Sequence, residues 1–207
     1  MKKTLLAILI AGTLGACTKQ DVIDTGRPSP VFNGTVWQYL QSDDYNWKAT
    51  VQMIERGGLT DAFDGKVDTL KEITFFGPTN FSILRYLYDN GLDSVAQLTP
   101  EFCRETILKH LVKGKYLKKD FPFRNREYYV YDAAQTGYSQ LTSLEGNVLR
   151  AYLEKTDFQE TIADAGPVKM FLYSMTIGMQ VPVASPDIQP SNGVVHSLNY
   201  NYTLGNI

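Results

Sequence analysis

Two histidines and two cysteines are the side chains of this sequence best suited to catalysis. A serine hydrolase needs a nucleophile in line with a histidine base and an acidic partner, often with the serine in a Gly-x-Ser-x-Gly turn. A zinc site needs three protein ligands, usually with closely spaced histidines. Here His110 and His196 lie far apart, and no such turn, phosphate-binding loop or dinucleotide-binding glycine pattern occurs. We therefore expect a protein that is not an enzyme and that carries neither a metal nor a cofactor.

The neighbouring carboxylates of Asp43 and Asp44 could offer oxygen ligands to calcium, a hard cation that prefers them. An EF-hand loop repeats Asp or Asn ligands at fixed spacing, and this segment does not. We therefore interpret the pair as a solvated turn that leads into a helix.

A group of tyrosines in the middle of the chain could bind a partner through flat rings with polar tips. The group contains Tyr128, Tyr129, Tyr131 and Tyr138. Because residues 127–131 are aromatic and β-branched, we expect a strand there, on which alternate rings face the core. An exposed aromatic strip that binds a glycan or a protein stays open as an alternative.

The N-terminus has the layout of an export signal, with Lys2 and Lys3, an uncharged run rich in Leu, Ile and Ala, and then Leu14-Gly15-Ala16-Cys17. The apolar run is too short to cross a bilayer comfortably, because a spanning helix needs about 20 apolar residues. An ordinary cleavage site would have a small residue in place of Leu14. The segment instead resembles the lipobox of bacterial lipoproteins, which implies a lipid anchor attached to Cys17.

Cleavage before Cys17 predicts three parts of the chain. These are a lipoprotein signal peptide at residues 1–16, a flexible tether at 17–33 and one folded domain at 34–207. Lipidation of Cys17 would leave Cys103 without a partner for an intramolecular disulfide, so the fold must depend on its hydrophobic core.

Charge excludes some partners. Removal of the signal peptide leaves 18 basic against 22 acidic side chains. Nothing in this balance attracts nucleic acid or an anionic membrane surface.

The first half of the domain is predicted to be mainly helical. Apolar residues recur at helical spacing within 36–40 and 46–56, and Gly57-Gly58 ends the second helix. Thr99-Pro100 starts another helix, with threonine as the N-cap and proline in the first turn. The inward stripe of that helix is predicted to contain Cys103, Ile107, His110 and Leu111. We therefore interpret Cys103 as a buried apolar residue and His110 as structural.

A short β-prone run at residues 73–76 stops at Gly77-Pro78. Asn80 then offers an oxygen acceptor suited to capping the next helix, worth about 1 kcal/mol against alanine. That helix should end at Asn90-Gly91. Its predicted buried residues are Ile83, Leu84, Leu87 and Tyr88.

The second half is predicted to contain strands, at residues 127–131, 147–153, 168–177 and 194–198. Asn192-Gly193 tolerates positive φ and could make a tight turn into the last of them. Val194, His196 and Leu198 would share one face of that strand, so we interpret His196 as a hydrogen-bonded structural histidine. Helices first and strands later indicate an α+β domain.

Several of these segments resemble the hallmark motifs of fasciclin-like (FAS1) domains. Residues 73–80, ITFFGPTN, resemble the strand-to-helix motif of the family, and residues 192–199, NGVVHSLN, resemble its closing strand. Residues 106–112 resemble the helix end that carries a tyrosine and a histidine in the family, although Lys109 stands where the tyrosine is common. Asp187 precedes the last motif, as in the family.

The resemblance runs through residues 34 to 204 and implies a fold and a function. The implied fold is an α+β, FAS1-like wedge-shaped β-sandwich with several helices packed along one side. The implied function is cell adhesion or the binding of a protein or glycan partner, without catalysis. The residues that carry the family motifs, expected to be mainly structural, are Phe76, Pro78, Thr79, Asn80, His110, Asp187, Asn192, Gly193, Val195 and His196.

Two functions of different classes follow from these expectations. The first is a membrane-anchored adhesion or interaction module of the cell envelope, an outer-membrane lipoprotein that faces either the periplasm or the outside. The second is a structural or accessory lipoprotein that assists an outer-membrane complex. Binding of a small hydrophobic ligand is a third possibility, which a pocket would favour.

Overall fold

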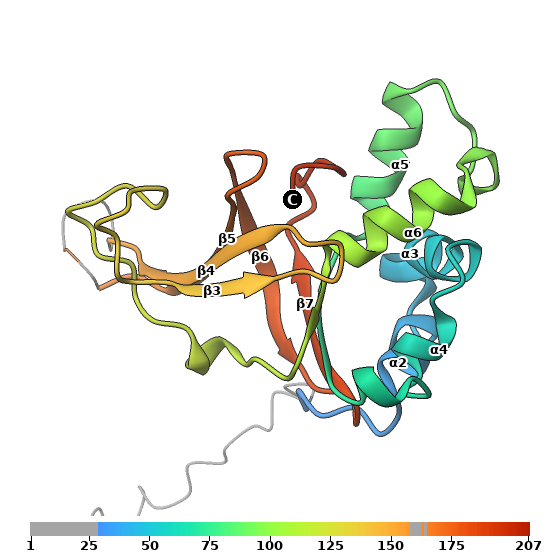
Figure 1. Ribbon diagram of the computed structural model, residues 1–207, viewed down its shortest axis with the longest axis horizontal. Helices are drawn as coiled ribbons and strands as arrows, with labels where there is room; N and C mark the ends of the chain where they lie inside the picture. The colour runs from blue at the N-terminus through green and yellow to red at the C-terminus, as the bar shows by residue number, and fades with distance from the viewer. Residues whose placement is uncertain (1–28, 158–162, 164) are drawn as a thin grey trace, which may run out of the picture.

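The computed structural model describes residues 29–157, 163 and 165–207 of the chain. Cys17, the predicted signal peptide and most of the predicted tether lie outside these residues. Figure 1 shows the helices gathered on one side and a strongly bent sheet extending away from them. The fold is α+β, as predicted. In the described part of the chain, no helix is both long and apolar enough to cross a membrane.

The helices of the described chain are short and mostly capped by side chains. The α-helices are α2 (Val36–Gln41), α3 (Asp44–Arg56), α4 (Thr60–Phe63), α5 (Asn80–Asp89) and α6 (Pro100–Lys109). The 3₁₀ helices are η1 (Asp68–Leu70), η2 (Val95–Gln97) and η3 (Lys118–Asp120). Side chains of Thr35, Asp43 and Thr99 accept amide hydrogen bonds at the starts of α2, α3 and α6, at 3.2, 3.2 and 3.1 Å. The predicted start at Thr99-Pro100 is confirmed.

Within the described residues, seven strands form one sheet in the order β2-β1-β7-β6-β5-β4-β3. Their bounds are β1 (Ile73–Gly77), β2 (Leu111–Lys113), β3 (Ser139–Thr142), β4 (Val148–Lys155), β5 (Val168–Ser174), β6 (Met179–Ile188) and β7 (Gly193–Leu198). All pairings between these strands are antiparallel except that of β1 with β7, which is parallel. A bridge between Val112 and Ser143 brings the two ends of the sheet together. The expected sandwich is thus one continuous sheet that folds back on itself.

Three of the four strands predicted in the second half are confirmed, and the prediction of a strand at residues 127–131 is wrong. That segment is a series of turns. Side chains satisfy its backbone: the Asp132 carboxylate accepts from the Tyr129 amide at 2.9 Å, and the Arg150 guanidinium donates to the Val130 carbonyl. Groups that would have paired with a neighbouring strand are therefore already hydrogen-bonded.

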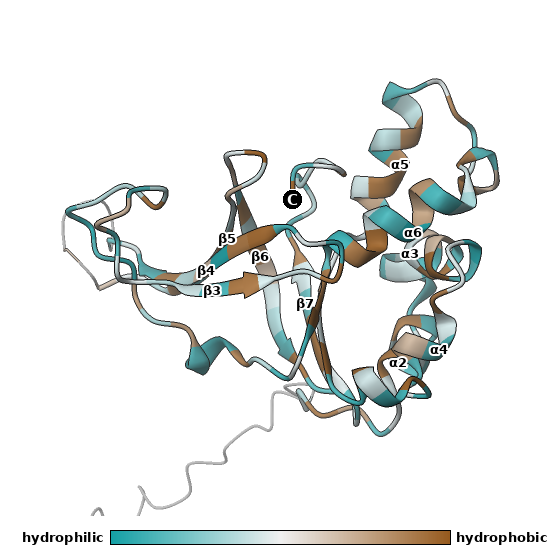
Figure 2. Cartoon of the chain, viewed as in Figure 1, coloured by the Kyte–Doolittle hydropathy of each residue, from teal (hydrophilic) through white to brown (hydrophobic). Residues whose placement is uncertain are grey.

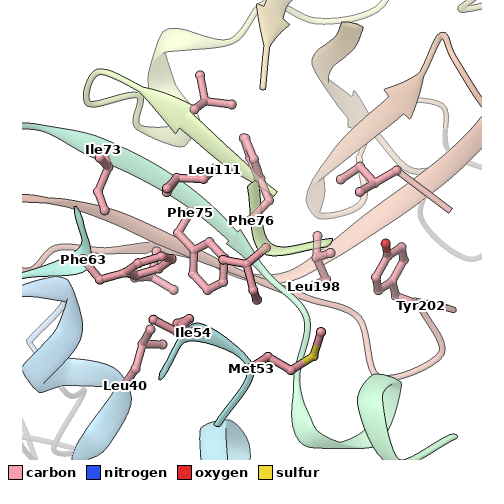
Figure 3. Packing of buried hydrophobic residues seen from close by; sticks show 14 of the residues in the cluster. Leu40, Met53, Ile54, Phe63, Ile73, Phe75, Phe76, Leu111, Leu198 and Tyr202 are labelled. Atoms are coloured by element: carbon pink, nitrogen blue, oxygen red, sulfur yellow. The ribbon is translucent and has the colours of Figure 1, made fainter. Parts of the chain in front are cut away.

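The hydrophobic core extends from the helices past β1 and β7 to buried residues of β3, β4, β5 and β6. Figure 3 shows Phe75 of β1 beside Phe63 of α4, with Leu40, Met53 and Ile54 approaching from α2 and α3. The rings of Phe63 and Phe75 meet edge to face, with centroids 4.9 Å apart. All five residues of β1 are buried. In Figure 2 the apolar colour concentrates where helices and strands meet, while the loops are mainly hydrophilic.

Gly193 begins β7, where the sequence predicted an Asn192-Gly193 turn with positive φ. The tight turn is present at residues 191 and 192, with the Gly193 amide bonded to the Pro190 carbonyl at 3.3 Å, but neither Asn192 nor Gly193 has a positive φ. The glycine serves close approach instead, since a Cβ at this position would lie 2.2 Å from the carbonyl oxygen of Ile73. The missing side chain therefore lets the backbones of β1 and β7 meet at the start of their parallel pairing.

Gly193→Ala is expected to lower the free energy of unfolding by about 2–3 kcal/mol, because the added methyl group forces β1 and β7 apart. Gly91→Ala is the matched control. A Cβ at Gly91 would meet nothing within 4 Å, and its φ of 66° alone should cause about 1 kcal/mol of strain. Urea unfolding followed by circular dichroism measures both variants. Equal losses would contradict the steric role of Gly193.

Candidate functional site

Asn80 joins α5 to α3; the prediction that it caps α5 is wrong. Thr79 occupies the N-cap position. The side-chain oxygen of Asn80 accepts a hydrogen bond from the Ala49 amide at 2.7 Å. Its side-chain nitrogen donates to the carbonyls of Asp44 and Tyr45 at 2.8 and 2.6 Å. In a regular α-helix the amide of Ala49 pairs with the carbonyl of Tyr45, four residues earlier. The Asn80 side chain bonds to both of these groups.

The turn between β1 and α5 is fixed by the same helix. The Thr50 hydroxyl donates to the Pro78 carbonyl at 2.6 Å. Phe76 and Thr79 on either side of this turn are buried. The first family motif therefore positions β1 against α3 and offers little side-chain surface to a ligand.

His110 is fully buried just after α6, and both ring nitrogens have partners. Nδ1 lies 2.7 Å from the Thr106 carbonyl and therefore donates to it, while Nε2 lies 2.9 Å from the Tyr202 hydroxyl and accepts from it. Burial lowers the pKa of His110 to about 4, because the charged ring would lose its hydration. The neutral ring thus ties α6 to the chain that follows β7.

His196 is buried in β7 and is likewise fully hydrogen-bonded. Nε2 donates to the Tyr116 carbonyl at 2.9 Å, and Nδ1 accepts from the Asp187 amide at 3.2 Å. The ring stacks on Phe76, with centroids 5.2 Å apart and planes 18° apart. Burial lowers the pKa of His196, so this ring is also neutral at pH 7.

Asp187 shapes an irregular part of β6. The pairing of β6 with β7 shifts register between Ser185 and Ile188, and Asp187 there has a φ of 66°. Its Oδ1 accepts a hydrogen bond from the Lys118 amide at 2.6 Å. Asp187 therefore fixes both the bulge in β6 and the segment that follows β2.

Asn192 connects the end of the sheet to the first helices. Its side-chain oxygen accepts from the Val36 amide at 2.7 Å, and its nitrogen donates to the Phe63 carbonyl at 3.0 Å. Val195 follows in β7, paired with Phe75 and fully buried. The second family motif, like the first, holds elements together.

No catalytic or metal-binding arrangement arises from these residues. Both histidines are neutral and fully bonded, and Cys103 is buried, which raises the pKa of its thiol. Within the described ranges, no group of three or more His, Cys, Asp or Glu side chains could hold a metal ion. The surfaces of the domain are therefore the places to look for a binding site.

The loop between η3 and β3 exposes three tyrosine rings. The exposed fractions of Tyr128, Tyr129 and Tyr131 are 38%, 67% and 51%. Tyr129 and Tyr131 stack in parallel, with centroids 5.3 Å apart and planes 2° apart. The ring of Tyr173, on β5, lies 6.1 Å from that of Tyr131. We call Tyr128, Tyr129, Tyr131 and Tyr173 the tyrosine surface.

Tyr138, the fourth tyrosine of the group singled out in the sequence, turns inward. The Arg150 guanidinium lies 4.0 Å from the centroid of its ring. Arg150 is only 7% exposed and also donates to the carbonyls of Val130 and Asp132. Sequence reasoning missed this anchor; the available signal was a lone arginine in the otherwise apolar run 148–153.

Gln135 holds the same loop from inside and was also missed. It is 2% exposed. Its side-chain oxygen accepts from the amides of Asn125 and Gly137 at 3.0 and 2.8 Å. Its nitrogen donates to the carbonyls of Asn125 and Tyr128 at 2.8 and 3.1 Å. All four hydrogen-bonding positions of the amide are filled, so the loop is pinned on both sides of the exposed rings.

A second exposed group lies on α5 and at the start of α3. The exposed fractions are 74% for Tyr45, 45% for Phe81, 54% for Leu84 and 84% for Tyr88. The prediction that Leu84 and Tyr88 are buried is wrong, because α5 turns Ile83 and Leu87 inward and leaves the adjacent stripe outside. The rings of Tyr45 and Phe81 meet edge to face at 6.0 Å. We call Tyr45, Phe81, Leu84 and Tyr88 the outer helix face.

A cleft with a mixed polar and apolar lining lies between α4, α6 and the turn after β3. Its volume is about 510 Å³. Its apolar lining consists of Leu59, Ala62, Val67, Leu70, Leu108 and Leu144. The side chains of Asp61 and Arg104 add one charge of each sign. Such a cleft has the size expected for a small-ligand site, so the third possibility raised by the sequence stays open.

Comparisons with known proteins agree with the motifs. The family model described as Fasciclin domain matches residues 45–200. Among solved structures, the chain is similar to a FAS1 domain pair from the insect cell adhesion molecule fasciclin I, with a TM-score of 0.54 and 18% identity. That match covers 81% of this chain and 50% of the other, so the chain spans half the length of the domain pair. A search of curated proteins finds no match.

Asn80→Ala is expected to lower the free energy of unfolding by about 2 kcal/mol, because it removes the hydrogen bonds that join α5 to α3. Asn90→Ala is the matched control: it deletes one exposed contact, to the Tyr86 carbonyl, and should cost less than about 1 kcal/mol. Urea unfolding measures both. The junction role of Asn80 is refuted if the two variants lose the same amount.

Mild acid is expected to destabilise the domain through His110. Between the ordinary pKa of 6.5 and the folded value of about 4, the unfolded chain binds a proton that the folded chain does not. Stability is therefore unaffected by this group above pH 6.5 and falls as the pH drops through that window, by about 3 kcal/mol at pH 4.

Unfolding measured at pH 7 and pH 4 for the wild type and for His110→Gln tests this expectation. The variant should be less stable at pH 7 but should lose less on acidification, because its residue 110 does not titrate. His196 acts in the same direction and remains in both proteins. The same loss in both proteins would contradict the role of His110.

Proposed function

This chain belongs to the fasciclin domain family, and we propose that it is a membrane-anchored, non-catalytic protein whose domain acts in cell adhesion or in binding a protein or glycan partner. The general role of the family in adhesion and binding supports the proposal. The use of the motif residues supports it as well, because the side chains of Asn80, Asp187, Asn192 and His196 bond to backbone within the domain. A ligand must then be bound by the surface of the domain.

The tyrosine surface is the observation that carries this proposal. Its rings are exposed although the loop that bears them is fixed by the buried side chains of Gln135 and Arg150. Tyrosine supplies contact area with little loss of conformational entropy, and it is enriched at sites that dominate binding energy. A fixed loop with exposed rings is therefore suited to a partner outside the molecule.

The tyrosine surface lies away from the point at which the predicted tether enters the domain. The chain enters the domain at one end of β6, where Gln189 bonds to the backbones of Pro30 and Phe32. Tyr173 pairs with Gln180 near the other end of the same strand. The strand has ten residues, which extend over about 30 Å. In an outer-membrane lipoprotein of this kind, the tether and the tyrosine surface would thus lie near opposite ends of β6, and the tyrosine surface would be accessible to a partner.

The outer helix face supports a second candidate function. Its stripe of Phe81, Leu84 and Tyr88 on one side of α5 has the pattern of a helix that docks against another protein. An accessory envelope lipoprotein that assists an outer-membrane complex would use such a face to contact another subunit.

Cys17→Ala tests the anchor. We expect the wild type in the membrane fraction and the variant either released in soluble form or unprocessed, because the alanine cannot receive lipid. Membrane fractionation with intact-mass measurement distinguishes these species. If the variant stays with the membranes at the mature mass of the wild type, the lipid anchor is refuted.

Protease added to intact cells separates the two candidate functions in the same strains. A periplasmic marker serves as the control and lysed cells as the reference. Cleavage on intact cells would favour adhesion outside the cell. Protection until lysis would favour the accessory role facing the periplasm.

A further inference from the structure

The loop of the tyrosine surface distributes its side chains in an unusual way. Its polar residue Gln135 is buried, and so is its aliphatic residue Val130, at 2% and 6% exposure. Tyr129 and Tyr131, on either side of Val130, are turned outward. If stability alone decided which side chains of this loop are buried, the tyrosine rings would be buried in preference to a glutamine. A buried amide is costly unless all its hydrogen-bonding groups have partners. The arrangement is the one expected of a preorganised binding site, whose contact residues rest on a hydrogen-bonded support.

The geometry of the rings defines the shape of the ligand. The Tyr129 and Tyr131 planes differ by 2°, so the outer ring of the stack presents a flat face in a fixed orientation. The Tyr173 ring, tilted by 42° to that of Tyr131, extends the row onto the sheet. Because Tyr129 and Tyr131 stack on each other, they offer a ligand an outer ring face and a series of ring edges. This arrangement suits a ligand that has an apolar face and a polar rim.

Polar groups suited to a hydroxylated ligand surround these rings. In the described chain, the hydroxyl groups of Tyr129 and Tyr131 make no hydrogen bond and can donate or accept. Gln180 is exposed and pairs with Tyr173 across the β5–β6 ladder, so its amide lies on the same sheet face. The site therefore combines stacking faces with donors and acceptors at their edges.

From these features we infer that the tyrosine surface is a saccharide-binding site. A pyranose ring has one face of C–H groups, which packs on an aromatic ring, and a rim of hydroxyls, which requires both donors and acceptors. The outer helix face differs in chemistry, because Leu84 and Phe81 bring apolar groups without polar tips. The inference rests on the proposed function and narrows its partner from protein or glycan to glycan.

Affinity electrophoresis of the full mature protein in detergent tests the inference. The gels contain one soluble polysaccharide each: a β-glucan, an α-mannan, a galactan or a pectin. We expect retardation by at least one of them. In Tyr129→Ala/Tyr131→Ala the affinity for that polysaccharide should fall by at least about tenfold, because the stacking faces are lost.

Two further variants distinguish the loss of ring or hydroxyl contacts with the ligand from a general effect on folding. Tyr200→Ala is the matched control, since Tyr200 is 66% exposed and lies outside the tyrosine surface; it should bind as the wild type does. Tyr129→Phe keeps the ring and removes the hydroxyl, and it should bind with intermediate affinity. Circular dichroism must show the same unfolding midpoint for all variants, as expected for exposed positions.

Two results would overturn the inference. One is a wild type that no gel retards, and the other is retardation that survives in the double alanine variant. Either result leaves the membrane anchor and the exposure of the domain to be judged by fractionation and protease cleavage, so failure of the saccharide site is distinguishable from failure of the proposed function. Loss of cell-to-cell or envelope binding in the double variant without any saccharide binding would assign the surface to a protein.

Discussion

The parallel pairing of β1 with β7 is the contact on which the rest of the domain depends. β1 has the helices on one side and β2 and β7 as its neighbours in the sheet, so it belongs to both parts of the molecule. A parallel pair needs a long connection, and most of the domain lies between these two strands. Gly193 allows the backbones to approach at the point where the pairing begins, and Asn192 beside it binds the chain of α2 and α4.

Side-chain amides and imidazoles repeat one task throughout the structure. Asn80 bonds to backbone groups of α3, and Asn192 and His196 each bond to backbone groups of two other segments. Gln135 does the same within the loop of the tyrosine surface. A buried group of this kind stabilises the fold only if all its partners are in place, so it also specifies how the elements are arranged. In the described chain Cys103 is a free thiol, so it contributes no disulfide to the fold. The arrangement of the elements is instead fixed by these hydrogen-bonded junctions together with the hydrophobic core.

The sequence was most informative where the cause of a structure is local. The cap at Thr99 and the inward position of Cys103 follow from residues within two turns, and both are as predicted. The prediction of a strand at residues 127–131 is wrong because Gln135 and Arg150 bond to the backbone of this segment. The positions of these two side chains in space depend on the finished fold. The prediction that Asn80 caps α5 is wrong for the same reason, since the partners of its side chain lie in α3.

Periodicity and hydropathy also have limits in this protein. A helical period indicates which stripe faces inward but not how wide the buried stripe is, so Leu84 and Tyr88 were assigned to the core with Ile83 and Leu87. The loop that bears Tyr129 and Tyr131 is coloured largely hydrophilic in Figure 2, because charged and amide residues such as Arg126, Glu127 and Asp132 surround its tyrosines. The family motifs located the fold well but not the tyrosine surface, which lies outside them.

The place of β7 within the sheet has a consequence for how the chain is made. Among the seven strands of the described residues, β7 comes last in the sequence, yet it lies between β1 and β6. A nascent chain that has not reached residue 193 therefore carries two strand edges that face an empty position, each with unpaired amides and carbonyls. Such edges are the part of an unfinished protein most open to pairing with other chains. The strand order therefore leaves the edges of β1 and β6 open to other chains until residues 193–198 have been made.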